Sequence, residues 1–129
     1  MDELIDFNPD NELEKAIVAS RAGKMIMNDF LAIFVSSDII LPSQTEVNSD
    51  GSGLTPMMFD KNGTNMIAAF SSLERVPKMG MQIPFALKVN ARWCLEKLSG
   101  KYGLVLNPGF TEGFDISPDG IFNILRDFH

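Results

Sequence analysis

The chain opens with two stretches in which apolar residues return every three or four positions, as on one face of a helix. The first stretch follows Asn8-Pro9, a cap and proline typical of a helix start, and ends before Gly23. The apolar stripes of the two stretches are Leu13, Ala16 and Ile17, then Met27, Phe30, Leu31, Phe34 and Val35. The short connection between them predicts a helical hairpin or corner.

Shorter apolar runs between turn residues predict strands in the middle of the chain. Asn62-Gly63 separates the runs 57–59 and 66–70, and Asn-Gly supplies the positive φ values of a type I′ turn. We therefore predict a β-hairpin there. The other predicted strands are Asp38 to Pro42, Gln82 to Val89 and Leu104 to Leu106.

Short helices are predicted between and after these strands. Ser71-Ser72-Leu73-Glu74 has the form of a capping box, Asn90 caps a helix that carries Cys94 and Leu95, and Ser117-Pro118 begins the last helix. Such alternation predicts a single α+β domain of mixed α/β type over residues 1–129. We expect a mixed sheet of about five strands covered by four or five helices.

The segment from Gly103 to Pro118 carries the candidate binding surface. Asn107-Pro108-Gly109 stops the preceding strand, because proline lacks an N–H and glycine permits positive φ. Phe110 and Phe114 in the following turn either fold back on the core or contact a partner. The predicted partner-binding residues are Asn107, Phe110, Thr111, Glu112, Phe114 and Asp115, completed by Arg92 and Trp93 on the neighbouring helix.

Charge favours some partners over others. The chain has 11 basic and 17 acidic residues, a net charge of −6, and six acidic residues precede its first base, Lys15. An acidic domain is a poor nucleic-acid binder, since phosphate contacts need a basic surface. One alternative function is therefore an immunity-type protein that masks a basic toxin with its acidic N-terminal helix, including Glu12 and Glu14.

Catalytic chemistry has few candidates. The single cysteine, Cys94, lies on an apolar stripe, and the single histidine, His129, is the last residue, where nothing would hold a catalytic base. Glu112, Asp115 and Asp119 could bind a divalent cation or form an acid/base pair, which leaves a carboxylate-dependent hydrolase as a second alternative. Their spacing matches no calcium-loop pattern, and helix-end electrostatics is the favoured explanation of Asp119. We predict no catalytic residue, metal or cofactor.

The cellular compartment follows from two features. The apolar run from Phe30 to Val35 is too short to cross a bilayer, and the acidic start of the chain differs from the basic start of a secretory signal. We expect a cytoplasmic protein with no membrane partner.

The order of these elements resembles the SseB-like N-terminal domain, of the enhanced-serine-sensitivity family of bacteria. The resemblance runs from about Asn11 to Leu125 and includes Leu13-Glu14, Phe30-Leu31, the strand Ile39 to Pro42, Phe70-Ser71-Ser72-Leu73-Glu74, the helix Leu95 to Leu98, and Leu106-Asn107-Pro108-Gly109. Phe70-Ser71-Ser72 departs from the expected Phe-Thr-Ser but keeps the hydroxyl. Fuller members carry a second, C-terminal domain, whose activity cannot be transferred here. The resemblance implies no established enzymatic mechanism and supplies no catalytic residues. Together with the candidate surface at 107–115, this predicts a non-enzymatic domain that binds a protein partner.

Overall fold

The computed structural model describes residues 8–76, 85–98 and 101–128. Four helices, a short 3₁₀ helix and six strands follow one another in this part of the chain. In order they are α1 Glu12–Arg21, α2 Met27–Val35, β1 Asp38–Ser43, β2 Met58–Lys61, β3 Thr64–Ala69, η1 Leu73–Arg75, β4 Phe85–Asn90, α3 Ala91–Leu98, β5 Gly103–Leu106, β6 Phe114–Ile116 and α4 Pro118–Asp127. The predicted α+β class is confirmed.

Four strands form the larger sheet, in the order β2-β3-β5-β6. The β2–β3 hairpin is confirmed: Asn62 and Gly63 have φ of 53° and 87° at its turn. β3 and β5 are parallel, so the chain between them crosses over through η1, β4 and α3. β6 then pairs antiparallel with β5 and ends the sheet.

The other two strands, β1 and β4, form an antiparallel ribbon. The ribbon is joined to the larger sheet by isolated bridges from Ile40 to Phe70 and from Ser43 to Pro56. The strands thus divide between two sheets, and β6 adds one strand to the predicted set. β6 was missed because three residues are too few to show strand periodicity. The predicted strand from Gln82 begins outside the described residues.

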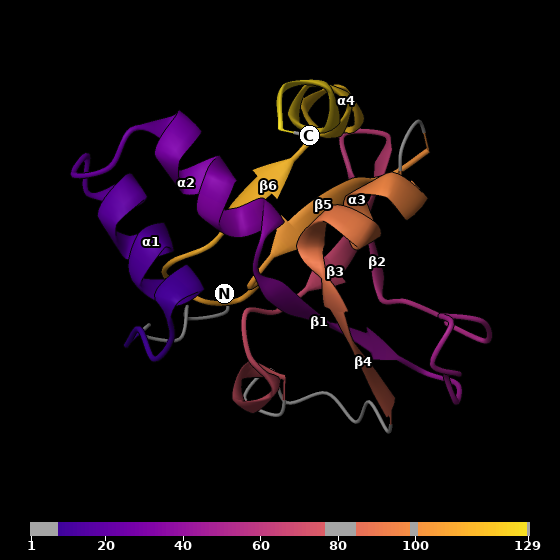
Figure 1. Ribbon diagram of the computed structural model, residues 1–129. Helices are drawn as coiled ribbons and strands as arrows, with labels where there is room; N and C mark the ends of the chain where they lie inside the picture. The colour runs from indigo at the N-terminus through magenta and orange to yellow at the C-terminus, as the bar shows by residue number, and fades with distance from the viewer. Residues whose placement is uncertain (1–7, 77–84, 99–100, 129) are drawn as a thin grey trace.

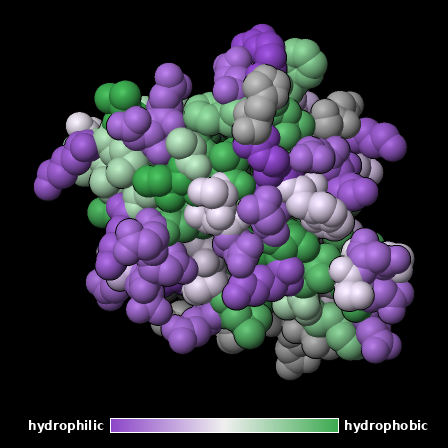
Figure 2. Space-filling view, in the orientation of Figure 1, coloured by the Kyte–Doolittle hydropathy of each residue, from purple (hydrophilic) through white to green (hydrophobic). Residues whose placement is uncertain are grey.

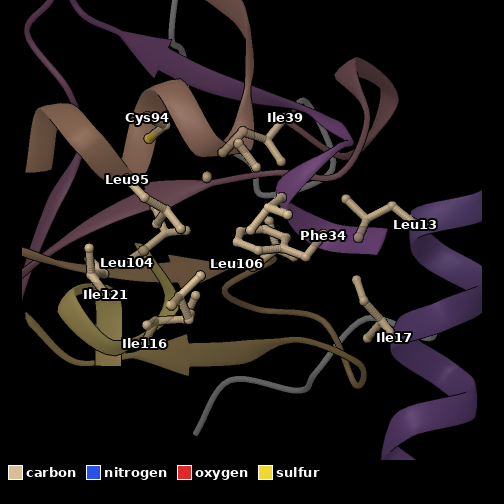
Figure 3. Packing of buried hydrophobic residues seen from close by; sticks show 14 of the residues in the cluster. Leu13, Ile17, Phe34, Ile39, Cys94, Leu95, Leu104, Leu106, Ile116 and Ile121 are labelled. Atoms are coloured by element: carbon tan, nitrogen blue, oxygen red, sulfur yellow. The ribbon is translucent and has the colours of Figure 1, made fainter. Parts of the chain in front are cut away.

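All four helices share one face of the larger sheet, with β6 lying between α2 and α4 (Figure 1). Alternate strand residues point to this face and pack with the helices, as Figure 3 shows for Phe34, Leu95, Leu104 and Ile116. A smaller apolar cluster contains one residue from β1, one just after β3, one just after η1 and one from the loop after β5: Ile40, Phe70, Val76 and Phe110. The domain therefore has a main hydrophobic core between the helices and the larger sheet, and a separate, smaller apolar cluster at the ends of β3 and β5.

Two predicted helix starts differ from the observed ones. α1 begins at Glu12, not at Asn8-Pro9, because the Asn11 side chain accepts the Glu14 N–H at 2.8 Å and caps the helix. Ser72, not Ser71, precedes η1, and its side chain makes no capping hydrogen bond. The predicted capping box is wrong because the Ser71 hydroxyl is used elsewhere, in the contact described next.

Candidate functional site

Asn107 fixes the start of the loop that follows β5. Its φ of 56° lies in the left-handed region, which asparagine tolerates better than most residues. Its backbone N–H donates to the Ala69 carbonyl at 2.8 Å, and its Oδ1 accepts the Ser71 N–H at 3.0 Å. Its Nδ2 also donates to Ser71 Oγ at 2.9 Å. The residue is 2% exposed, so a partner cannot reach it, and Asn107 is not part of the binding surface as predicted.

Ser71 connects this loop to a buried ion pair. Its hydroxyl donates to Glu14 Oε2 at 2.5 Å, and Arg75 donates to both oxygens of the same carboxylate, from Nε at 3.0 Å and from Nη2 at 2.7 Å. The Asp10 N–H also donates to Glu14 Oε1, at 2.8 Å. Each carboxylate oxygen therefore has two donors, as a buried charge requires. We call Glu14, Ser71, Arg75 and Asn107 the polar junction.

Glu14 stays ionised in the polar junction. Burial by itself would raise the pKa of the carboxyl, but hydrogen bonds from Arg75, Ser71 and the Asp10 N–H outweigh burial and hold it below its ordinary value. The side chain of Glu14 is 0% exposed. Glu12 and Glu14 are the two acidic residues expected to contact a toxin in the immunity-type alternative. Glu14 is buried and cannot do so.

Phe110 folds back on the domain. It is 5% exposed, its ring lies 6.5 Å from that of Phe70 at an interplanar angle of 79°, and the Arg75 guanidinium lies 5.4 Å from its centroid. Edge-to-face packing and the cation–π contact both favour this inward position. The predicted contact at Phe110 is therefore wrong: the side chain completes the smaller apolar cluster.

Phe114 lies at the base of an open groove. Its ring packs edge to face on Phe30 at 4.9 Å and on Phe34 at 5.4 Å, and the side chain is half-buried. Because side chains alternate along a strand, Phe114 and Ile116 face the helices, and Asp115 faces the opposite side of the sheet. The loop therefore divides in two: its first half is buried, and its second half reaches the groove.

The groove has a volume of about 520 Å³ and lies between α1, α2, β6 and α4. Its lining is mainly apolar and consists of Ile17, Ser20, Arg21, Met27, Phe30, Leu31, Phe114, Asp115, Ile116, Ser117, Gly120, Asn123 and Ile124. At its α2 side, Ile26 and Met27 are 67% and 59% exposed. Apolar side chains gather over α2 in Figure 2. A groove of this volume suits specific binding, and such exposed neighbours mark interaction sites.

Arg21 and Glu112 lie at one end of β6. Arg21 Nη1 donates to the Gly113 carbonyl at 3.0 Å, and its Nε pairs with Glu112 Oε2 at 2.5 Å. The side chain of Arg21 is still 51% exposed. Because Arg21 belongs to α1 and not to the sheet, the Gly113 carbonyl that it binds is directed away from β5.

The remaining carboxylates do not gather with Glu112. Asp115 pairs with Lys61 of β2, and Asp119 lies in the first turn of α4, where Ser117 caps the helix by accepting the Gly120 N–H at 3.0 Å. Within the ranges 8–76, 85–98 and 101–128, no three metal-binding side chains come together. The cation and acid/base interpretations of these residues gain no support from the geometry.

Arg92 and Trp93 begin α3 and belong to a different region. Trp93 lines a separate hollow of about 340 Å³, where a Cβ on Gly51 would lie 2.8 Å from its ring. Lys97 stands over the same ring at 5.5 Å. None of the residues lining this hollow comes from the 107–115 loop. Trp93 therefore lines a different hollow from the loop, and the predicted patch that joins Arg92 and Trp93 to the loop gains no support from it. Thr111, by contrast, is half-buried in a shallow hollow beside Arg21.

The remaining sequence predictions concern Cys94, His129 and membrane-spanning helices. Cys94 is 1% exposed, and burial raises the pKa of its thiol to about 12, so it is not a thiolate at neutral pH. His129 lies outside the described residues. Among the helices of the described ranges, none has the length and apolar character needed to cross a bilayer.

A comparison with protein families identifies the family of the chain. The family model of the SseB protein N-terminal domain matches residues 13–123. The chain belongs to this family. The matched range includes every member of the polar junction and most of the groove lining. Neither the search of curated proteins nor that of solved structures gave a match.

Sequence reasoning missed both the polar junction and the groove. Glu14 directly follows Leu13 and precedes Ile17 by one helical turn, which places it at the border of the apolar stripe and could have signalled a buried carboxylate. The run Phe30 to Val35 makes α2 apolar nearly all round, more than one core face can cover. This excess of apolar residues indicates a second apolar surface on α2, outside the core.

Proposed function

We propose that this SseB N-terminal domain binds a protein partner, without catalysis, through the groove between α1, α2, β6 and α4. The observation that carries the proposal is the groove's apolar lining next to exposed Ile26 and Met27. Burying exposed apolar surface contributes favourably to association, and fully desolvated pockets are where most binding energy is found. Phe114 and Asp115 are the members of the predicted surface that line it.

The proposed compartment is the bacterial cytoplasm, as expected from the sequence. The single thiol, Cys94, is buried, and the domain depends on no disulfide within its own sequence. The partner is proposed to be a protein because the groove is open and exposed apolar surface, Met27 and the preceding Ile26, continues beyond its lining.

A matched pair of variants tests the groove. Met27 and Phe122 are almost equally exposed, at 59% and 61%, but only Met27 lines the groove. We expect immobilised wild type and Phe122→Glu to capture the same partner from lysate of the native organism, and Met27→Glu to lose it. With the partner purified, the Kd of Met27→Glu is expected to rise at least about tenfold, the usual effect at an interface anchor.

Circular dichroism melting of all three proteins provides the folding control. Equal affinity of Met27→Glu and wild type for the purified partner would contradict the groove as the contact surface. Loss of binding in Phe122→Glu instead would move the surface to the outer face of α4.

A further inference from the structure

The edge of β6 offers backbone hydrogen-bonding groups to the groove. β6 ends the four-stranded order, and the carbonyl of Gly113, just before it, already accepts a hydrogen bond from outside the sheet, from Arg21 at 3.0 Å. Backbone groups point to alternate sides along a strand that pairs antiparallel. The N–H and C=O of Asp115, two residues further on, are therefore directed to the same outer side.

Side chains around this edge alternate in chemistry as well. Phe114 and Ile116 face the helices and the apolar lining of the groove, whereas the Asp115 side chain faces the other side of the sheet, where it pairs with Lys61. A strand laid against β6 would place its own side chains in the same alternation. Residues next to Phe114 and Ile116 would enter the groove, and the residue next to Asp115 would meet a carboxylate that is 35% exposed.

We propose that the partner contributes an extended segment that pairs with β6 as an added strand, with apolar residues on both sides of a lysine or arginine. This inference rests on the proposed function and specifies the form of the occupant. Charge complementarity supports it, because the Asp115 carboxylate, although paired with Lys61, is still 35% exposed to a second cation, and the chain has a net charge of −6. Main-chain pairing supplies affinity in such complexes, and the alternating side chains supply specificity.

An amphipathic helix is the competing occupant. A helix satisfies its own backbone groups and would leave the N–H and C=O of Asp115 facing an apolar groove without partners. An extended segment satisfies them. The backbone of β6 therefore favours a strand over a helix.

The binding of synthetic peptides with alternating leucine and lysine to the 129-residue chain tests this directly. In one peptide every lysine amide is N-methylated, and in its matched control every leucine amide is. An added strand pairs with β6 through the amides on only one of its two sides. One methylated peptide is therefore expected to bind at least about tenfold more weakly than the parent peptide, and the other nearly as well as the parent. The parent is also expected to slow hydrogen exchange at the Asp115 amide.

Side-chain substitutions complete the test. Replacing the peptide's lysines with glutamates, or making Asp115→Asn in the protein, is expected to weaken binding several-fold, about the effect of one exposed ion pair. Equal binding of both methylated peptides would overturn the added strand and leave the groove proposal standing. No binding by the alternating peptide would also overturn the added strand. Partner capture that survives in Met27→Glu would overturn the groove proposal itself.

Discussion

The polar junction and the groove both draw on α1 and on the segment after β5, but they use them in opposite ways. In the junction, Glu14 and Asn107 are almost fully buried, and each carboxylate oxygen of Glu14 has two donors. In the groove, Arg21 and Phe114 stay partly accessible, and the edge of β6 faces outward. A single loop can thus be anchored at one end and available at the other, so adjacent residues of one motif need not share a role.

The largest expected difference between the two regions is in stability. Arg75→Ala leaves the Glu14 carboxylate buried without its cation, which typically costs about 3–5 kcal/mol. We expect urea denaturation to show a loss of this size in the free energy of unfolding. The double variant Glu14→Leu/Arg75→Met removes both charges and is expected to be much closer to wild type. A double variant as unstable as Arg75→Ala would contradict this account.

Acid should affect the junction next. The folded-state pKa of Glu14 is depressed, so its contribution to stability is fully present above the unfolded value, about 4.3. That contribution is lost as pH falls from there through the folded-state pKa. The loss should be smaller than that of Arg75→Ala, because a protonated carboxyl keeps its shape. Urea denaturation between about pH 6 and pH 3 should show that the free energy of unfolding declines less steeply with falling pH in Glu14→Gln than in wild type. Parallel declines would argue against Glu14 as the titrating group.

The backbone conformation of Asn107 is expected to make a smaller contribution to stability in the same region. Asn107→Gly and Asn107→Ala lose the same side-chain hydrogen bonds to Ser71, but only alanine is strained at a φ of 56°. We expect Asn107→Ala to be about 1 kcal/mol less stable than Asn107→Gly. Thermal melting of the pair measures this difference, and an alanine variant of equal stability would mean that the loop relaxes out of the left-handed conformation.

The smallest stability effect is expected in the groove. Met27 is 59% exposed, and Met27→Glu places an acidic residue in the first turn of α2, so its free energy of unfolding should stay within about 0.5 kcal/mol of wild type. The same urea series measures it. A loss near that of Arg75→Ala would show that this side of the groove is part of the core, and would remove the contrast between the two regions.

Local signals in the sequence were sufficient for most elements. The helix Pro118–Asp127 with its Ser117 cap, the Asn62-Gly63 hairpin and the apolar stripe of α2 all depend on contacts between residues close in the chain. Elements that depend on distant partners were harder to predict. β6 is three residues long and exists because Leu104 and Leu106 pair with it, and the Ser71 hydroxyl turns away from η1 because Glu14 is 57 residues away in sequence but adjacent in space.

The sequence by itself determined the fold class, the family and the fact that the segment after Leu106 turns sharply, because periodicity and turn chemistry are short-range properties. Only the tertiary structure decided which side of that turn is buried. Whether Phe110 or Phe114 is accessible depends on Arg75, Phe70 and Phe30, which approach the loop from other elements. Burial is a property of such assembled neighbours, and no local pattern in residues 107–116 records it.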